Sequence, residues 1–197
     1  MLRKIINWLA ITTYKACGWT IVGAFPIDTK KYPKTILAIA PHNTAWDVPI
    51  GLGVRPQMGQ QVGFLGKKEL FVGVLGPFFK ALGGTPVDRT APHGLVGKVV
   101  RIFNSKEVYS IAITPEGTRR NVKELKRGFY HMAIEAKAAI VMIGFDFPRK
   151  TVIFEEPFFP SGNWNEDKVK LATFFSTIQG PQKDWIKNYL NEANSGK

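Results

Sequence analysis

The chain has 197 residues, of which 45% are hydrophobic and 21% are charged. This length suits one domain that is large enough to bury a core, and the composition excludes disorder for most of the chain. The single cysteine, Cys17, excludes an internal disulfide, which fits a reducing compartment.

The chain carries a formal charge of +12, from 27 Lys and Arg against 15 Asp and Glu. A surplus this large favours an anionic partner, such as nucleic acid, lipid headgroups, or a phosphorylated or CoA-like substrate. The charge alone does not distinguish between these partners. Because the sequence shows no groove-binding helix, aromatic sheet motif or zinc finger, we expect no nucleic-acid partner.

The N-terminal residues have the pattern of an amphipathic helix. One face carries apolar residues at helical spacing, namely Leu2, Ile5, Ile6, Leu9 and Ala16. The other face carries Arg3, Lys4, Asn7 and Lys15. A spanning helix needs about 20 mostly apolar residues, and these polar residues interrupt the stretch. We therefore expect residues 1–24 to form a membrane-interface helix and its lead-in. The alternative is an ordinary surface helix packed on the domain.

After Pro26 the pattern alternates between apolar strands and helices. Strands are predicted at residues 35–40, 61–65, 85–87, 108–114, 139–145 and 151–154. Helices are predicted at residues 45–54, 95–104, 129–137, 166–178 and 182–191. This order predicts one α/β domain over residues 25–197, with a mostly parallel central sheet flanked by helices. Active sites on such sheets lie beyond the carboxyl ends of the strands.

A histidine follows the first of these strands, and a carboxylate follows it five residues later near the start of a helix. Histidine is the side chain best suited to move protons near neutral pH. If Asp47 binds one ring nitrogen of His42, the other nitrogen is free to accept a proton, and the carboxylate stabilises the imidazolium that forms. The alternative is that His42 is a turn residue and Asp47 a helix cap.

Basic residues and glycines follow other strands. The segment Glu116-Gly117-Thr118-Arg119 follows one strand, and Arg89 and Lys68 follow two others. Gly117 permits a tight turn that exposes backbone N–H groups, and the planar guanidinium of Arg119 suits a phosphate. Singly, each basic residue is a solvated surface charge, but three such strand ends favour a convergent phosphate site.

These motifs, in this order, resemble those of the glycerolipid acyltransferase family that includes lysophosphatidic acid acyltransferase. Residues 42–47 are similar to its His–x4–Asp motif, residues 84–89 to its second motif and residues 115–119 to its third. A degenerate fourth motif falls at residues 140–145. The resemblance covers residues 35–148, which is most of the chain.

The resemblance implies a catalytic dyad of His42 and Asp47 that activates a lysophospholipid hydroxyl against an acyl thioester. The expected reaction converts 1-acylglycerol 3-phosphate into phosphatidic acid, with acyl-CoA or acyl-carrier protein as co-substrate and with no other cofactor and no metal. The residues expected to bind the acceptor are Arg89, Glu116, Gly117, Thr118 and Arg119. Lys68 is added from its position at a strand end. Such an enzyme would be peripheral or monotopic, on the cytoplasmic face of an anionic membrane.

Departures from the family pattern leave the acceptor open. Pro41 stands where the family commonly has Asn, Thr44 where Ser is common, and residues 140–145 lack the usual proline. The alternatives are another lyso-lipid acceptor, such as an amino-acid-based lipid, or a non-enzymatic peripheral protein that binds anionic lipid. The apolar residues 70–82 would line an acyl-chain groove or dip into lipid, with a buried core helix as the alternative.

Overall fold

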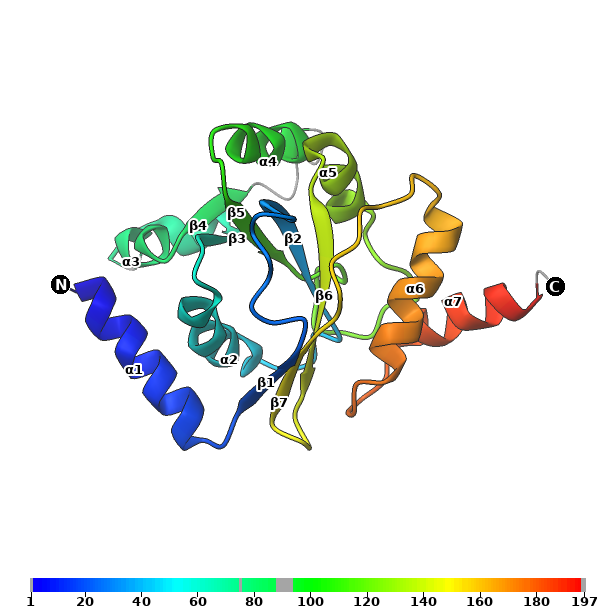
Figure 1. Cartoon of the computed structure of the whole chain (residues 1–197), viewed down its shortest axis with the longest axis horizontal. Coiled ribbons are helices and arrows are strands. Elements are labelled where there is room, and N and C mark those ends of the chain that lie inside the picture. Colours follow the sequence, from blue (N-terminus) through cyan, green and yellow to red (C-terminus); the bar gives the residue numbers. More distant parts are fainter. Residues whose placement is uncertain (1, 75, 88–93, 196–197) are drawn as a thin grey trace.

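A seven-stranded sheet forms the centre of the fold, in the order β1-β7-β6-β2-β5-β3-β4 (Figure 1). The structure is a computed structural model that describes residues 2–74, 76–87 and 94–195. The strands are β1 (Thr20–Gly23), β2 (Lys34–Ile39), β3 (Val62–Lys67), β4 (Gly84–Val87), β5 (Tyr109–Ile113), β6 (Ala139–Asp146) and β7 (Thr151–Phe154). All neighbours are parallel except β6 and β7. The predicted fold class, an α/β domain with a mostly parallel sheet, is confirmed.

Helices pack on both faces of this sheet. They are α1 (Leu2–Ala16), α2 (Asp47–Val54), α3 (Gly76–Ala81), α4 (Leu95–Asn104), α5 (Gly128–Ala136), α6 (Trp164–Ser176) and α7 (Asp184–Ser195), with the 3-10 helices η1 (Arg55–Met58) and η2 (Lys68–Phe71). Successive side chains of a strand point to opposite faces. Accordingly, Ile36 of β2 joins the core under α4 to α7, whereas Leu37 joins the core under α1 and α2.

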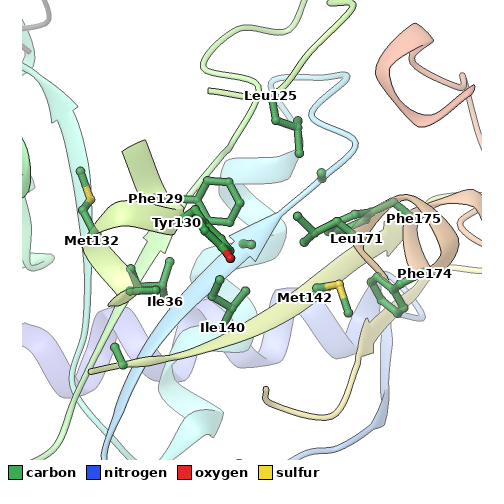
Figure 2. Close-up of a cluster of buried hydrophobic side chains, with 14 of the residues drawn as sticks. Ile36, Leu125, Phe129, Tyr130, Met132, Ile140, Met142, Leu171, Phe174 and Phe175 are labelled. Atoms are coloured by element: carbon green, nitrogen blue, oxygen red, sulfur yellow. The ribbon is translucent and has the colours of Figure 1, made fainter. Parts of the chain in front are cut away.

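The larger core lies between the sheet and helices α4 to α7 (Figure 2). It joins Ile36 and Ile140 of the sheet to Phe129 of α5 and to Leu171 and Phe175 of α6, each of them buried. Burying one such side chain stabilises a fold by about 1.5–3 kcal/mol. This packing therefore holds the C-terminal helices firmly on the sheet.

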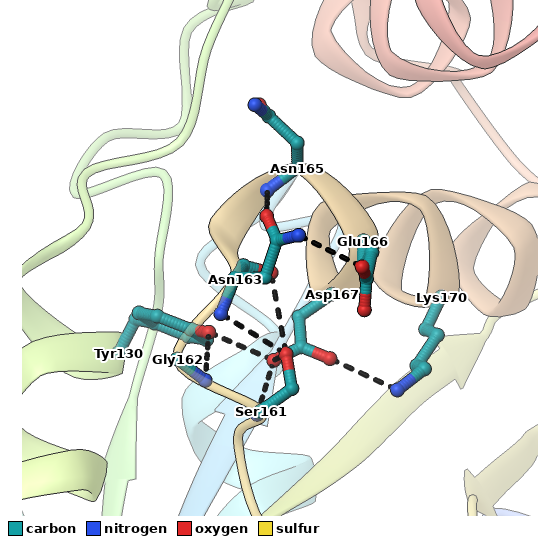
Figure 3. Close-up of polar contacts among 8 residues, drawn as sticks. All are labelled: Tyr130, Ser161, Gly162, Asn163, Asn165, Glu166, Asp167 and Lys170. Atoms are coloured by element: carbon teal, nitrogen blue, oxygen red, sulfur yellow. Dashed lines mark hydrogen bonds and ion pairs between the residues drawn. The ribbon is translucent and has the colours of Figure 1, made fainter.

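A buried carboxylate, Asp167, fixes the start of α6 (Figure 3). It accepts hydrogen bonds from the Tyr130 hydroxyl at 2.8 Å and the Ser161 N–H at 2.7 Å, and pairs with Lys170 at 2.9 Å. Burial acts to raise the pKa of Asp167, but these donors outweigh it and hold the pKa below its usual value. The network ties α5 to α6 and has a structural role.

Helix α1 packs on the domain through one side only. Tyr14 is 5% exposed and lies against Gly53 of α2, where any added Cβ would come within 2.6 Å of it. Two residues of the predicted apolar face, Ile5 and Leu9, are 48% and 50% exposed, and the nearby Trp8 is 64% exposed. The helix therefore keeps an apolar surface available, and its membrane contact stays a prediction. Within the described residues, no helix combines the length and apolar character needed to cross a membrane.

The apolar segment at residues 70–82 is broken into η2 and α3. Phe71 and Leu82 are buried, but Val72 is 69% exposed and Val74 is 96% exposed. The alternative of a buried core helix is therefore wrong for the middle of this segment. An acyl-chain groove or lipid contact there remains a prediction.

Candidate active site

The loop between β2 and α2 brings His42 and Asp47 together. Strand β2 ends at Ile39, and Asp47 is the first residue of α2. The ring Nδ1 of His42 makes a short hydrogen bond with Oδ2 of Asp47. The His42 side chain is 15% exposed and that of Asp47 is 5% exposed. The predicted pair is therefore in contact at the carboxyl end of a central strand.

This contact has a direct chemical consequence for the imidazole ring. A carboxylate at Nδ1 fixes the tautomer with the proton on that nitrogen, so Nε2 is the nitrogen able to accept a proton. Within the loop, the Thr44 hydroxyl accepts a hydrogen bond from the Trp46 N–H at 2.9 Å, which shapes the turn before α2.

Glu116 contacts the backbone of His42 rather than its ring. The backbone N–H of His42 donates to Oε2 of Glu116 at 3.2 Å, and the indole N–H of Trp185 donates to Oε1 at 3.1 Å. The Lys183 ammonium lies 3.7 Å from Oε2. Burial raises the pKa of Glu116, although the Trp185, Lys183 and His42 contacts oppose this rise. With a fully buried side chain, Glu116 has the contacts of a residue that supports His42, whereas the sequence predicted one that lines the acceptor site.

The rest of the Glu-Gly-Thr-Arg turn lies directly after β5, which pairs with β2. Gly117 has a φ of +65°, and an added Cβ there would lie 3.1 Å from the Lys126 side chain. Its N–H donates to the Thr114 carbonyl at 3.0 Å, so this amide serves the turn itself. Thr118 is half-buried, and its hydroxyl accepts from the Arg120 N–H at 3.2 Å. Arg119 has an exposed side chain, as expected of a group that meets a substrate.

Lys68 and Arg89 are the two remaining predicted residues. Lys68 directly follows β3, which is parallel to β5, and its side chain is exposed. Arg89 lies outside the described residues. The structure therefore places Lys68 at the edge that carries His42, and the binding roles of Lys68 and Arg89 remain predictions.

The C-terminal part of the chain supplies site residues that the sequence did not reveal. Lys183 and Trp185 contact Glu116, and the Asn43 side-chain amide donates to the Pro181 carbonyl at 3.2 Å. In the sequence, a lysine and a tryptophan in a polar helical segment predict an exposed charge and a packing residue, not site residues. Only their burial, at 4% and 0% exposure, marks them as part of the site.

The side chains of His42 and Asp47 identify this site by their chemistry. Two hollows, of about 490 and 530 Å³, lie around Tyr14 and around Asn188, and neither is lined by His42 or Asp47. Among the residues that the structure describes, no three His, Cys, Asp or Glu side chains are grouped to hold a metal ion.

Comparison with known proteins agrees with this chemistry. The Acyltransferase family model matches residues 27–146, which is more than half of the chain. The chain belongs to the Acyltransferase family. This match confirms the resemblance drawn from the sequence motifs, and it includes both the dyad and the Glu-Gly-Thr-Arg turn of this acyltransferase. Lys183 and Trp185 lie beyond the matched residues.

A solved structure has the same fold as this acyltransferase. It is the crystal structure of the 1-acyl-sn-glycerophosphate (LPA) acyltransferase PlsC from Thermotoga maritima, with a TM-score of 0.55. The two chains share 16% sequence identity, and the match covers 96% of this chain and 78% of that chain. At this identity the likeness shows the fold. No significant match was found among curated protein sequences.

Proposed function

We propose that this acyltransferase moves a fatty acyl group from an acyl-CoA or acyl-carrier-protein thioester to the free hydroxyl of a lysophospholipid. The proposed acceptor is 1-acylglycerol 3-phosphate, and the product is phosphatidic acid. The observation that carries the proposal is the contact between His42 Nδ1 and Asp47 Oδ2 at the carboxyl end of β2, with the Glu-Gly-Thr-Arg turn held against the same loop. The acceptor agrees with the activity named for the Thermotoga maritima enzyme.

The proposed reaction needs one proton carrier. His42 Nε2 takes the proton of the acceptor hydroxyl while the oxygen forms a bond to the thioester carbonyl carbon. The tetrahedral intermediate then collapses, the C–S bond breaks, and the Nε2 proton passes to the leaving thiolate. Asp47 holds the ring through Nδ1 and stabilises the imidazolium between these two transfers. No covalent enzyme intermediate forms.

Charge and position support an anionic acceptor. The exposed guanidinium of Arg119 follows β5, and the exposed ammonium of Lys68 follows the neighbouring strand β3. Parallel strands present their carboxyl ends at one edge, so both cations lie at the edge that carries His42. We propose that Arg119 and Lys68 bind the acceptor phosphate, with Gly117 and Thr118 shaping the turn.

Exposed apolar residues support peripheral contact with a membrane, where a lyso-lipid acceptor resides. Trp8 on α1 and Val72 and Val74 after η2 are 64%, 69% and 96% exposed. Single exposed apolar residues are ordinary, but several large ones on a chain with a charge of +12 suit an anionic bilayer.

Turnover with defined substrates tests the proposal. Purified protein is incubated with labelled acyl-CoA or acyl-carrier protein and a panel of lyso-lipids with and without a phosphate. We expect transfer to 1-acylglycerol 3-phosphate and loss of that transfer in His42→Ala. Full activity of folded His42→Ala would refute the mechanism. Transfer only to an uncharged or amino-acid-based lyso-lipid, with no effect of Arg119→Ala on phosphorylated acceptors, would refute the proposed acceptor.

A further inference from the structure

The segment at residues 181–188, here called the C-terminal strap, lies against both loops of the active site. It includes the first turn of α7 and lies beyond the residues that the family model matches. One hydrogen bond joins the strap to the His42 loop, from Asn43 Nδ2 to the Pro181 carbonyl. Others join it to residues 119–123: Lys183 Nζ donates to the Arg119 and Arg120 carbonyls, the Asp184 N–H to Asn121 Oδ1, the Trp185 N–H to the Val122 carbonyl, and Asn188 Nδ2 to the Lys123 carbonyl. The strap thus follows the chain after Glu116 almost residue by residue.

Lys183 is the buried cation of the strap. Its Nζ lies 2.7 Å from the Arg119 carbonyl, 3.2 Å from the Arg120 carbonyl and 3.7 Å from Oε2 of Glu116. Lysine is almost never fully buried unless it is paired, and here the ammonium meets three acceptors of a single turn. These contacts hold the backbone carbonyls of Arg119 and Arg120, next to the exposed Arg119 side chain.

Trp185 fixes the other carboxylate oxygen of Glu116. Its ring is fully buried, with edge contacts to Phe175 at 5.8 Å and to Tyr189 at 5.7 Å between ring centroids. The indole N–H is the only polar atom of the side chain, and it donates to Oε1 of Glu116 at 3.1 Å. Because packing immobilises the ring, the direction of this hydrogen bond is fixed.

We infer that Lys183 and Trp185 are positioning residues for His42. They hold Glu116 in place from one side, and Glu116 accepts the His42 backbone N–H on the other side. The position of the histidine is thereby set by residues that lie 141 and 143 positions later in the chain. The catalytic consequence rests on the proposed function, whereas the structural link between the strap and the His42 loop does not.

Two conservative variants and two controls test this link. Lys183→Met keeps an unbranched side chain, one atom shorter, but removes the ammonium, and Trp185→Phe keeps an aromatic ring but removes the N–H. Tyr189→Phe, the first control, removes a buried hydroxyl on the same helix that accepts from the Leu125 N–H at 2.8 Å. Lys187→Met, the second control, removes an exposed charge from α7.

Hydrogen–deuterium exchange of peptides that contain residue 42 is measured in each folded variant, together with kcat and KM for acyl-CoA and 1-acylglycerol 3-phosphate. We expect faster exchange in Lys183→Met and Trp185→Phe than in either control. We also expect kcat to fall about tenfold with KM within about twofold, because small displacements of a catalytic group lower the rate of the chemical step.

The two readouts separate this inference from the proposed function. Unchanged exchange around residue 42 in both variants would overturn the inference, whatever the activity. Faster exchange in a protein that transfers no acyl group to any acceptor would support the link and refute the proposed function. If Lys183→Met does not fold, the comparison of Trp185→Phe with Tyr189→Phe decides the question alone.

Discussion

The loops that follow β2 and β3 leave the sheet at the same edge but are built in opposite ways. The loop after β2 carries His42, which is bonded through its ring to Asp47 and through its backbone N–H to the buried Glu116. The segment after β3 exposes Val72 at 69% and Val74 at 96%. Hydrogen bonds within the protein hold the first loop in place, whereas the second exposes apolar surface to the surroundings.

This difference corresponds to two physical requirements of the proposed reaction. Proton transfer demands a fixed geometry, and hydrogen bonds between buried polar groups supply it. Contact with a lipid surface demands exposed apolar area and tolerates loose geometry. Substitutions of the bonded residues around His42 should therefore affect rate, stability or both, and substitutions of the exposed Val72 and Val74 should affect membrane binding alone.

The largest expected effect is on the dyad itself. Asp47→Asn keeps the shape of the side chain but no longer holds the His42 tautomer with its proton on Nδ1. We expect kcat for acyl transfer to fall by a factor of about 100 to 10,000, with little change in the thermal midpoint. The matched control is Glu135→Gln, an exposed carboxylate-to-amide change on α5. Equal turnover of Asp47→Asn and the control would show that the dyad does not perform the chemistry.

Removal of the carboxylate behind the dyad should be the largest effect on stability. Glu116→Ala leaves the buried Lys183 ammonium, the Trp185 indole N–H and the His42 N–H without their common acceptor. Breaking a buried charge pair in this way costs about 3–5 kcal/mol of the free energy of unfolding. Urea denaturation measures this loss. A loss no larger than that of the exposed control Glu135→Ala would contradict the buried role assigned to Glu116.

A smaller effect is expected on the exposed loop and α1. Each of the substitutions Trp8→Ser and Val74→Ser removes an exposed apolar side chain that belongs to neither hydrophobic core. We expect each change to weaken binding to vesicles of anionic phospholipid about tenfold, since burying one large apolar side chain contributes about 1.5–3 kcal/mol. Vesicle sedimentation at low salt measures this. The control is Val108→Ser, a 39% exposed valine before β5, at the opposite end of the strands. Equal binding of all four proteins would place the membrane contact elsewhere.

Truncation of residues 1–18 is a less specific test of the same surface. It removes α1, for which the sequence pattern predicted an apolar face toward the membrane. The structure adds that Tyr14 belongs to the core under α1 and α2, so the truncation should also lower the thermal midpoint. Trp8→Ser avoids this complication.

Local patterns predicted most of the fold. The helix expected at residues 95–104 and the strand expected at residues 151–154 coincide with α4 and β7, because hydrophobic periodicity marks their ends. Strand β1 was missed because four residues with three of them largely exposed carry no pattern of burial. Its place at the sheet edge depends on β7, which follows more than 100 residues later.

The site shows the same limit of sequence reasoning. His42 and Asp47 are five residues apart, so local structure brings them together and the motif was sufficient to find them. The role of Glu116 depends on Lys183 and Trp185, whose contacts span 67 and 69 positions and arise only when α7 docks on the fold. Long-range burial gives Glu116 the contacts of a supporting residue, where the sequence pattern predicted an acceptor ligand.

The smallest expected effect is on the pH dependence of the free energy of unfolding, which should involve Glu116 but not the exposed segment after β3. Burial raises the pKa of Glu116 above its ordinary value of 4.5, against the Trp185, Lys183 and His42 contacts that lower it. Between 4.5 and the raised value, the native state keeps a proton that the unfolded chain has lost. Stability from this group is therefore lost as the pH rises through that interval. Glu116→Gln does not titrate, so its stability should not show this decline.

Urea denaturation across the acid range measures the free energy of unfolding of the wild type and of Glu116→Gln. Other titrating groups contribute to both proteins, so their contributions cancel in the difference. We expect the wild type to lose stability relative to the variant as the pH rises from about 4.5 toward neutrality. Val74→Ser should leave the wild-type dependence unchanged, because this side chain is 96% exposed and carries no titrating group. Parallel curves for the wild type and Glu116→Gln would mean that the Glu116 carboxylate titrates like one in water, and its proposed support of His42 would then lack the buried environment on which it depends.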